Sequence, residues 1–218
     1  MRIFATGDHE RIEELKMKFA LETTATDLSR FDVVFDLNAD ENFSYIPQQY
    51  AQLENKLLIF CSVKKSIASM LANTESKVMC HLVGLNALPT FIDRNMLEVS
   101  FRDEESRTAF SQFASEMKID FLEVEDSVGM VTPRVICMII NEACLALDEG
   151  TASMEDIDKA MKLGTNYPFG PFEWCDRIGI RDVYETLEAI RIYSRDDRYK
   201  ISSLLRHKYQ DRAKFYNS

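Results

Sequence analysis

The sequence has little glycine and histidine, no closely paired cysteines and no long apolar run. Its 218 residues include seven glycines and three histidines, and Gly7 is the only glycine before Gly84. A phosphate-binding GxGxxG loop is therefore excluded from the N-terminal part of the chain. The cysteines form no CxxC pair, so we expect neither a disulfide framework nor a metal site; they are Cys61, Cys80, Cys137, Cys144 and Cys175.

Basic residues are also in deficit. The 36 acidic and 26 basic side chains give a formal net charge of −10, which disfavours a nucleic-acid partner because phosphate backbones attract basic surfaces. No stretch approaches the roughly 20 apolar residues that a membrane span needs, and we expect no leader segment. The sequence indicates a folded cytoplasmic protein, and its 46% hydrophobic content is sufficient for one large or two small domains.

Short β-rich runs alternate with helical ones in the first half. The runs 32–37 and 56–60 are rich in Val, Leu, Ile and Phe, as in strands that are buried on both faces of a parallel sheet. The alternation predicts βαβ units and an α/β domain. We expect strands at residues 2–5, 32–37, 56–60, 80–85, 96–101 and 120–124, and helices at residues 10–19 and 104–117.

The second half is predicted to be all helical. Apolar residues lie on almost every side of the segment 134–149, which indicates a buried helix or a subunit contact, and Gly150 ends it. Ser153 caps the next helix and Gly164 ends it. Further helices are expected at residues 173–178, 181–193 and 202–209. We therefore predict an α/β domain at residues 1–127 and a helical domain at residues 128–218.

The most specific motifs lie at residues 129–180. They include NEA at 141–143, EGTASMEDIDKAMKLG at 149–164 and YPFGPFEWCDRIG at 167–179, and DDRYKISSLLRHKYQDRAKFY follows at 196–216. Together these segments resemble the C-terminal domain of the 3-hydroxyacyl-CoA dehydrogenase family. The resemblance implies a Rossmann-like N-terminal domain that binds NAD, and a helical domain that forms a dimer and closes over the substrate. Family membership alone does not establish activity.

The resemblance also extends to the catalytic positions. Residues 83–100 are similar to the family segment that holds a histidine general base and the glutamate that orients it. The glutamate position is Glu98, but the histidine position is Asn86. An amide cannot accept a proton at neutral pH. Asn86 and Glu98 are therefore the candidate catalytic residues, with the base replaced.

The expected cofactor site is reduced in the same way. Gly7 is followed by the acids Asp8, Glu10, Glu13 and Glu14, whose charges would repel a pyrophosphate; alternatively, they only favour the positive end of a helix dipole. Compared with the family, a helix and about one strand are missing before residue 32, so the adenine-binding half is shortened. Gly7, Asp40 and Glu41 remain as cofactor-binding candidates.

Residues 59–66 resemble the strand and substrate loop of the family. Ser62 and Ser66 are kept, but the asparagine expected after Ser62 is Val63, and the substrate-facing serine is Lys65. The candidate substrate-binding residues are Ser62, Lys64, Lys65 and Ser66. The two lysines form a small basic patch that suits CoA phosphates.

Three functions are compatible with these substitutions. The first is a degenerate dehydrogenase that keeps the fold and the dimer, has little or no NAD-dependent oxidation, and acts through binding or assembly. In that case no cofactor is expected, and NAD is expected only if the ancestral activity persists. The second is an active NAD-dependent enzyme that uses Glu98 with Lys64 or Lys65. The third is a non-catalytic acyl-CoA-binding module. The resemblance implies a homodimer through the helical domain in each case.

Overall fold

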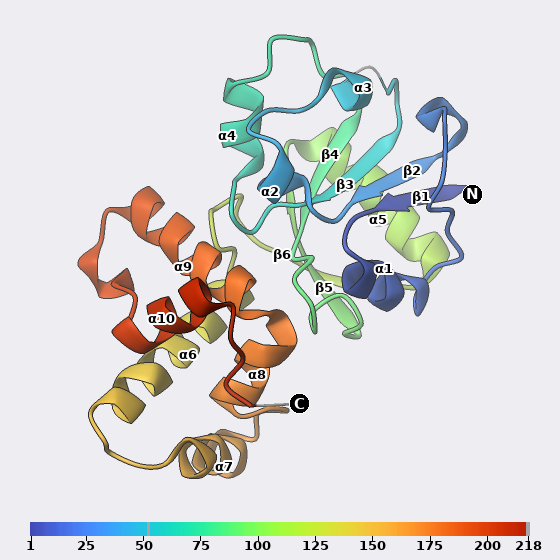
Figure 1. Ribbon diagram of the computed structural model, residues 1–218. Helices are drawn as coiled ribbons and strands as arrows, with labels where there is room; N and C mark the ends of the chain where they lie inside the picture. Colours follow the sequence, from blue (N-terminus) through green and yellow to red (C-terminus); the bar gives the residue numbers. More distant parts are fainter. Residues whose placement is uncertain (52, 217–218) are drawn as a thin grey trace. The chain divides into compact units, whose positions relative to one another are not determined.

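The computed structural model describes residues 1–51 and 53–216. It divides into two compact units, Met1–Met130 and Val131–Ser218. The first unit is a six-stranded sheet with helices, and the second consists of helices (Figure 1). The predicted fold class, an α/β domain followed by a helical domain, is confirmed.

The six strands lie side by side in the order in which they occur in the chain. The first four are parallel, β5 is antiparallel to β4, and β6 is parallel to β5. All six predicted strands occur, and β5 has its predicted bounds. The strands are β1 (Ile3–Thr6), β2 (Val33–Asp36), β3 (Leu57–Cys61), β4 (His81–Leu85), β5 (Met96–Phe101) and β6 (Asp120–Glu123).

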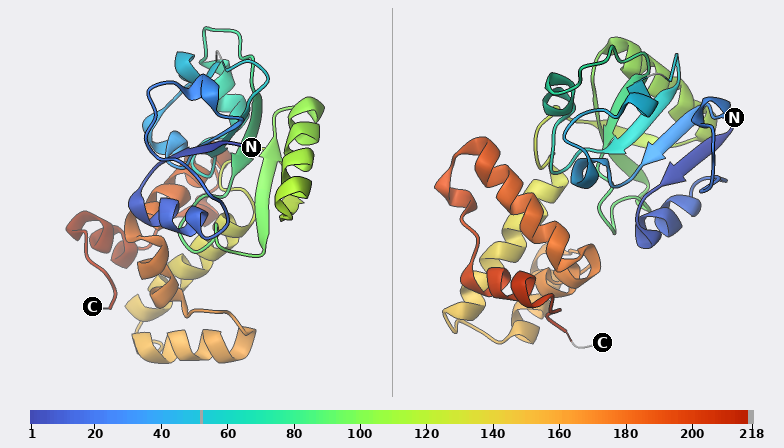
Figure 2. Two further views of the ribbon diagram at one scale, coloured as in Figure 1. Left: turned by 90° about the vertical axis from the view of Figure 1, so that its right-hand side faces the viewer. Right: turned by 45° about the horizontal axis from the view of Figure 1, so that its top comes forward.

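Helices cover both faces of this sheet. The helix α5 (Glu104–Met117) lies on one face, and α2 (Ala39–Asn42), α3 (Gln48–Ala51) and α4 (Ile67–Ala72) lie on the other (Figure 2). The two predicted helices are observed as α1 (His9–Lys16) and α5. The short helices α2, α3 and α4, and a 3-10 turn at Leu28–Arg30, were not predicted. Elements of fewer than two turns show too little periodicity to be recognised.

The apolar core has a layer on each face of the sheet. Val34, Phe60 and Leu82 belong to the layer that also contains Tyr50 of α3 and Met70 of α4. On the opposite face, Phe35 of β2 contacts Phe19 and Phe113, with ring centroids 5.6 and 6.2 Å away. Burial of both faces explains the nearly continuous apolar runs in β2 and β3.

The strand β1 lies at one end of the sheet. Among the described residues, its outer side carries only an isolated bridge between Phe4 and Glu22, formed by hydrogen bonds from Ala5 N to Glu22 O and from Glu22 N to Ile3 O, each 2.9 Å. In the common doubly wound order two further strands lie beyond the first. This sheet is therefore shorter on the side where a dinucleotide's adenine half is bound in such folds.

The parallel strands end at one edge of the sheet, which we call the carboxyl edge. Thr6, Asp36 and Phe60 are aligned across β1, β2 and β3, and Cys61 is aligned with Leu85. The residues that follow the four strands are Gly7, Leu37, Ser62 and Asn86. Ligands of open α/β sheets bind outside this edge, so the candidate site residues from different parts of the sequence come together here.

The second unit contains five α-helices among its described residues: α6 (Thr132–Asp148), α7 (Met154–Thr165), α8 (Pro171–Ile178), α9 (Ile180–Ser194) and α10 (Ser203–Asp211). A 3-10 turn, Asp197–Tyr199, precedes α10. Ser153 caps α7 as predicted, because its side chain accepts a hydrogen bond from Asp156 N. Cys137, Cys144 and Cys175 are free thiols buried between α6 and α8 and their neighbours. Within residues 1–51 and 53–216, no helix is long and apolar enough to cross a membrane.

Candidate functional site

Asn86 and Glu98 face each other where β4 meets β5. The Asn86 side-chain nitrogen donates to Glu98 Oε2 at 3.4 Å, and Asn86 N donates to Glu98 O at 3.0 Å. The two residues are only 2% and 8% exposed. The structure therefore brings the two candidate catalytic residues together. The pair holds an amide against a carboxylate, so it contains no group with the proton affinity of an imidazole.

A second polar feature adjoins this pair, on the strands β3, β4 and β5. The hydroxyls of Ser62 and Ser100 flank Gly84, and a Cβ atom added to Gly84 would lie 2.2 Å from Ser62 Oγ and 2.5 Å from Ser100 Oγ. Both hydroxyls are buried, and neither has a hydrogen-bond partner within residues 1–51 and 53–216. Glycine at position 84 is thus required by the two serines. Ser62 was a candidate substrate-binding residue, whereas Ser100 was not predicted.

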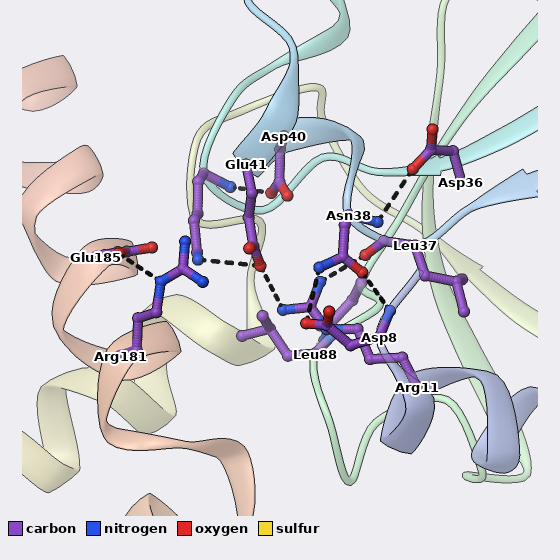
Figure 3. Close-up of polar contacts among 12 residues, drawn as sticks. Asp8, Arg11, Asp36, Leu37, Asn38, Asp40, Glu41, Leu88, Arg181 and Glu185 are labelled. Carbon is purple, nitrogen blue, oxygen red and sulfur yellow. Dashed lines mark hydrogen bonds and ion pairs between the residues drawn. The ribbon is translucent and has the colours of Figure 1, made fainter. Parts of the chain in front are cut away.

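Asp8, the residue before α1, forms two hydrogen bonds with Asn38. Asn38 Oδ1 accepts from Asp8 N at 2.8 Å, and Asn38 Nδ2 donates to Asp8 Oδ2 at 2.8 Å. Figure 3 shows the two side chains in contact. The N-terminus of a helix normally offers its free N–H groups to an anion. Here the Asn38 amide engages one of these groups, and the Asp8 carboxylate adds a negative charge.

Gly7 leaves no room for a side chain, because its backbone lies against Leu37 and Asn38. Its φ is +147°, and an added Cβ would lie 2.7 Å from Leu37 Cβ and 2.8 Å from Asn38 Oδ1. In a dinucleotide-binding loop, a glycine lets the backbone approach a pyrophosphate. In this chain, the glycine lets the β1–α1 turn pack against the residues that follow β2.

Next to this turn is a cluster of buried charged groups. Arg11 Nη2 lies 2.8 Å from Glu41 Oε1, and Lys64 Nζ lies 3.4 Å from the same oxygen. Arg11 also donates to the backbone oxygen of Leu37. Figure 3 shows the Arg11 guanidinium between Leu37 and Glu41. The candidate cofactor residue Glu41 and the candidate substrate residue Lys64 are therefore partners in one ion-pair network, which includes an arginine that was not predicted.

The remaining candidates make structural hydrogen bonds. Asp40 Oδ2 accepts from Lys64 N at 2.6 Å, and Lys65 Nζ donates to Phe43 O at 2.8 Å. The Ser66 side chain caps α4 by accepting from Ser69 N. Asp126 carboxylate oxygens accept from the first two N–H groups of α4, each at 2.8 Å. The predicted basic patch is thus tied to backbone and carboxylate oxygens, and the N-terminus of α4 is occupied by an acid.

The acids of α1 are arranged differently from the prediction. Asp8 contacts Asn38, which follows β2 at the carboxyl edge. Glu13 pairs with Lys16 at 2.7 Å, and Glu14 accepts from Thr90 N at 2.7 Å. Burial raises the pKa of Glu14. Side chains in successive positions of a helix point in different directions, so a run of acids in the sequence does not form a single acidic surface.

A buried carboxyl group lies at the end of β2. Tyr50 OH donates to Asp36 Oδ2 at 2.7 Å, and Asn38 N donates to Asp36 Oδ1 at 3.2 Å. Burial raises the pKa of Asp36, and the two hydrogen bonds oppose this shift. The pKa of Tyr50 is also raised, by burial and then by the Asp36 charge. This pair ties α3 to the carboxyl edge and was not predicted.

Polar residues of the helical-domain motifs form hydrogen bonds between its helices and loops. Asn141 of α6 donates to Lys200 O at 3.0 Å and accepts from Ser202 N at 2.8 Å. Asp158 of α7 accepts from Phe172 N at 2.8 Å and from Glu173 N at 3.0 Å, so it caps α8, whose own N-cap residue is Gly170. The NEA and GPFEW segments therefore contain residues that hold one helix to another.

Comparisons with known proteins match the same segments of the helical domain. The family profile "3-hydroxyacyl-CoA dehydrogenase, C-terminal domain" matches residues 129–214. The 3-hydroxyadipyl-CoA dehydrogenase of Escherichia coli is 44% identical over 87 residues, which are 40% of this chain and 18% of that protein. Residues 129–214 therefore form a C-terminal domain of the 3-hydroxyacyl-CoA dehydrogenase family.

Two further relatives of the family show how far the similarity extends. A probable 3-hydroxybutyryl-CoA dehydrogenase of Bacillus subtilis is 37% identical over 103 residues, which are 47% of this chain and 36% of that protein. The solved (S)-3-hydroxybutyryl-CoA dehydrogenase of Ralstonia eutropha has a TM-score of 0.71 and 26% identity, over 88% of this chain and 69% of its own. The chain thus matches less than half the length of the two curated relatives, although the fold similarity includes most of its own residues.

The dinucleotide expected from the family does not fit the residues at the carboxyl edge. A pyrophosphate needs free N–H groups, a glycine-rich turn and positive charge. Asn38 instead engages the Asp8 N–H group, the Asp8 carboxylate adds negative charge, and Arg11 and Lys64 already pair with Glu41. Within residues 1–51 and 53–216, no group of three acidic, histidine or cysteine side chains is arranged to hold a metal ion.

Arg11, Asn38, Ser100 and Asp126 are the main residues of this region that sequence reasoning missed. Arg11 is the only basic residue in the acidic segment 8–15, and a single arginine on a short helix carries no recognisable pattern. Asn38 had a usable signal, because it directly follows the end of a predicted parallel strand. Asp126 lies far from α4 in the sequence, so only the fold brings the two together.

Proposed function

We propose that this protein is a 3-hydroxyacyl-CoA dehydrogenase-like protein with little or no NAD-dependent oxidation, and that it acts through binding or assembly. The observation that carries the proposal is the occupation of the carboxyl edge by the chain's own charged side chains. Arg11 and Lys64 both pair with Glu41 beside the turn that should receive a pyrophosphate. No cofactor is expected at this edge.

The catalytic pair supports the same proposal. Asn86 lies against Glu98 in the place of a histidine, and an amide has no role as a proton acceptor at neutral pH. General-base catalysis typically contributes a factor of about 10²–10⁴ in rate, and positioning of the reactants contributes further orders of magnitude. Loss of the base together with the nucleotide site removes both contributions.

Calorimetric titration of the protein with NAD and with NADH tests this proposal. We expect no heat of binding at micromolar ligand concentrations, because Arg11 and Lys64 already pair with Glu41 and the turn before α1 lacks a glycine-rich loop. In parallel, NADH production should be undetectable with a panel of 3-hydroxyacyl-CoA thioesters at high protein concentration. A micromolar dissociation constant for either nucleotide, or turnover above the uncatalysed rate, would overturn the proposal.

An active enzyme with a diverged site is the second candidate. Its support is the buried Glu98 carboxylate, which the structure retains at the carboxyl edge next to Asn86, and the names of the relatives, which are dehydrogenases. The partners that the sequence offered to Glu98 were Lys64 and Lys65. Both lysines have other contacts, with Glu41 and with Phe43 O. The thioester panel distinguishes this candidate from the degenerate protein.

The proposed assembly is a homodimer formed by the helical domain. Its described residues include large apolar side chains that are exposed, among them Leu163, which is 78% exposed, and Ile192 and Tyr193. A hollow of about 710 Å³ also adjoins Leu163 between α7, α8 and the segment that contains Lys214 and Tyr216. Sedimentation at micromolar concentration should give a dimer, and a monomer alone would contradict this part of the proposal. We propose a cytoplasmic location, which cell fractionation can check.

Binding of acyl-CoA without catalysis is the third candidate function. The candidate contacts are Ser62, Lys64, Lys65 and Ser66. A ligand that binds only the folded state raises the melting temperature. Acetoacetyl-CoA and CoA should therefore raise it if this mode operates, and unchanged melting at millimolar ligand would remove acyl-CoA from the proposed partners.

A further inference from the structure

The helix α6 of the second unit has two apolar faces. One face contains Ile136, Ile140 and Cys144, which are buried where α8, α9 and α10 pack against α6 (Figure 1). A helix that packs against its own domain on one side normally carries polar residues on the opposite side. In α6 the opposite side is apolar as well, so the packing within the unit does not account for it.

This second face of α6 is exposed. Val131, which directly precedes the helix, is 51% exposed, Val135 is 49% exposed and Leu145 is 36% exposed, and Met138 is half-buried between them. These four residues are spaced by four, three and seven positions, so they lie in one line along the helix. We call them the α6 stripe. At a rise of 1.5 Å per residue, the stripe is about 20 Å long.

The α6 stripe has the composition of a contact surface. Glu142 is the charged residue in this line, four positions after Met138 and three before Leu145. The centres of protein interfaces are depleted of charged residues, and a contiguous apolar surface on a folded domain marks contact with another molecule. Of the two roles that the sequence predicted for this helix, burial explains one face and a subunit contact explains the other.

The distribution of charge indicates that the partner is a second copy of the chain. Residues 1–130 carry 13 basic and 22 acidic side chains, whereas residues 131–218 carry 13 and 14. Two copies that approach through their first units repel each other, because each of these units has a formal charge of −9. The second unit is nearly neutral, so repulsion does not oppose its contact with an identical unit. A neutral apolar stripe also offers little to a strongly charged partner.

Two identical stripes can complement each other about a twofold axis. In such a contact the same surface of both copies is used. Two antiparallel α6 helices place the small Val135 of one copy near the larger Leu145 of the other, and the Met138 side chains lie between these contacts. Methionine is flexible and fills irregular gaps between packed surfaces.

We infer that the α6 stripe is the surface through which two copies of this chain associate, with their α6 helices antiparallel across a twofold axis. The inference rests on the proposed homodimer and deepens it, because it selects one helix of the second unit. Leu163 of α7 and Ile192 of α9, which are more exposed than any residue of the stripe, lie outside the contact.

Sedimentation of wild type and variants over a range of protein concentrations tests this surface. Leu145→Glu and Val135→Glu should each raise the dissociation constant of the dimer at least about 100-fold, because both copies then bury a carboxylate in an apolar contact. The matched controls are Leu163→Glu and Ile192→Glu. They introduce the same group at side chains that are 78% and 67% exposed, and they should leave the dissociation constant unchanged.

A milder substitution separates association from folding. Val135→Thr keeps the shape of the side chain and adds a hydroxyl group, which should weaken the dimer about tenfold because each copy buries it. Ile192→Thr is its control and should have no effect on association. The circular dichroism spectra of all variants should match that of wild type. If a glutamate variant does not fold, Val135→Thr decides the question.

The overturning result is a dimeric wild type whose association is unchanged in Leu145→Glu and Val135→Thr. Loss of the dimer in Leu163→Glu or Ile192→Glu would also overturn the inference, because the contact would then lie on α7 or α9. In both cases the proposed homodimer stands and only its surface is rejected. A monomeric wild type would reject the homodimer itself, and the titrations with NAD and the thioester panel decide the rest of the proposed function separately.

Discussion

Asn86 and Glu98 are joined twice across the β4–β5 pair, once through their backbones and once through their side chains. The side-chain contact places an amide nitrogen 3.4 Å from a carboxylate oxygen. In the proposed function, Glu98 is the orienting half of an acid–base pair, and its side chain is bonded to Asn86, which stands in the position of the group that it would orient. This geometry makes the pair suitable for a substitution that restores the missing group.

The variant Asn86→His should place an imidazole beside the Glu98 carboxylate. A nearby negative charge favours the protonated imidazole, so its pKa should lie above the ordinary value of about 6.5. NMR titration measures this pKa, and comparison with wild type separates the new signal from those of His9, His81 and His207.

The matched control for this titration is Asn86→His/Glu98→Gln. Removal of the carboxylate should lower the imidazole pKa by at least about 1 unit. Equal pKa values in the two variants would show that Glu98 does not act on the introduced group. Neither variant should produce NADH from 3-hydroxyacyl-CoA thioesters, because the carboxyl edge is still occupied by the chain's own ion pairs.

A matched pair of glycines tests the packing of Ser62 and Ser100. Gly84→Ala introduces a Cβ 2.2 Å from one hydroxyl and 2.5 Å from the other, and overpacking of this kind typically costs about 1–3 kcal/mol. Gly164→Ala lies in α7 with no heavy atom within 4 Å of the new Cβ. It should raise the free energy of unfolding by about 0.5–1 kcal/mol.

Urea unfolding of both variants at one pH gives the comparison. Gly84→Ala should lower the free energy of unfolding, and Gly164→Ala should raise it. A Gly84→Ala protein as stable as wild type would show that Ser62 and Ser100 do not pack closely against Gly84.

Asp36 should make the stability depend on pH in an unusual direction. Burial raises the pKa of this carboxyl group, so the folded state binds its proton more tightly than the unfolded state does. The resulting stabilisation is fully present below the unfolded-state pKa of about 4 and is lost as the pH rises through the folded-state pKa. Wild type should therefore lose stability relative to Asp36→Asn as the pH rises from about 4 towards 7.

Asp27→Asn is the control with the opposite sign. The Asp27 side chain accepts hydrogen bonds from Ser29, and these lower the pKa of Asp27. Wild type should therefore gain stability relative to Asp27→Asn as the pH rises above the acidic range. Urea unfolding at several pH values measures both differences, and parallel curves for Asp36→Asn and wild type would contradict the effect of burial.

Asp158 should be a strong contributor to the stability of the helical domain. It is buried and accepts from two N–H groups at the start of α8 and from Tyr216 OH at 2.9 Å. Asp158→Ala leaves these donors without their acceptor, and we expect a loss of about 2–4 kcal/mol in the free energy of unfolding. Tyr216→Phe removes only one bond and should cost about 1 kcal/mol. If Asp158→Ala and Tyr216→Phe lose the same free energy in urea unfolding, the bonds from Asp158 to the start of α8 do not contribute to stability.

The sheet was predictable because its strands and its long helix carry strong local signals. β5 alternates apolar and polar residues, and α5 follows Asp103, which caps it through Ser106 N. Both elements have their predicted bounds. The short helices α2, α3 and α4 depend on contacts with the sheet, so their four to six residues show no pattern of their own.

The site was predictable in part. The Asn86–Glu98 pair followed from the family resemblance, and the structure brings these residues together. The Arg11–Glu41–Lys64 cluster joins α1, α2 and the residues after β3, and no spacing within the sequence marks such a contact. Glu41 and Lys64 were assigned to separate roles, because their shared neighbour Arg11 was not among the candidates.

The bridge between Phe4 and Glu22 has a consequence for solubility during and after folding. A parallel sheet that stops at β1 would present bare backbone groups to other chains, and such strands template aggregation. Here the Ala5 N–H group donates to Glu22 O and the Ile3 carbonyl oxygen accepts from Glu22 N, and the Glu22 side chain also pairs with Arg2 at 2.9 Å. A few residues of extended chain thus protect the shortened sheet from joining another copy edge to edge.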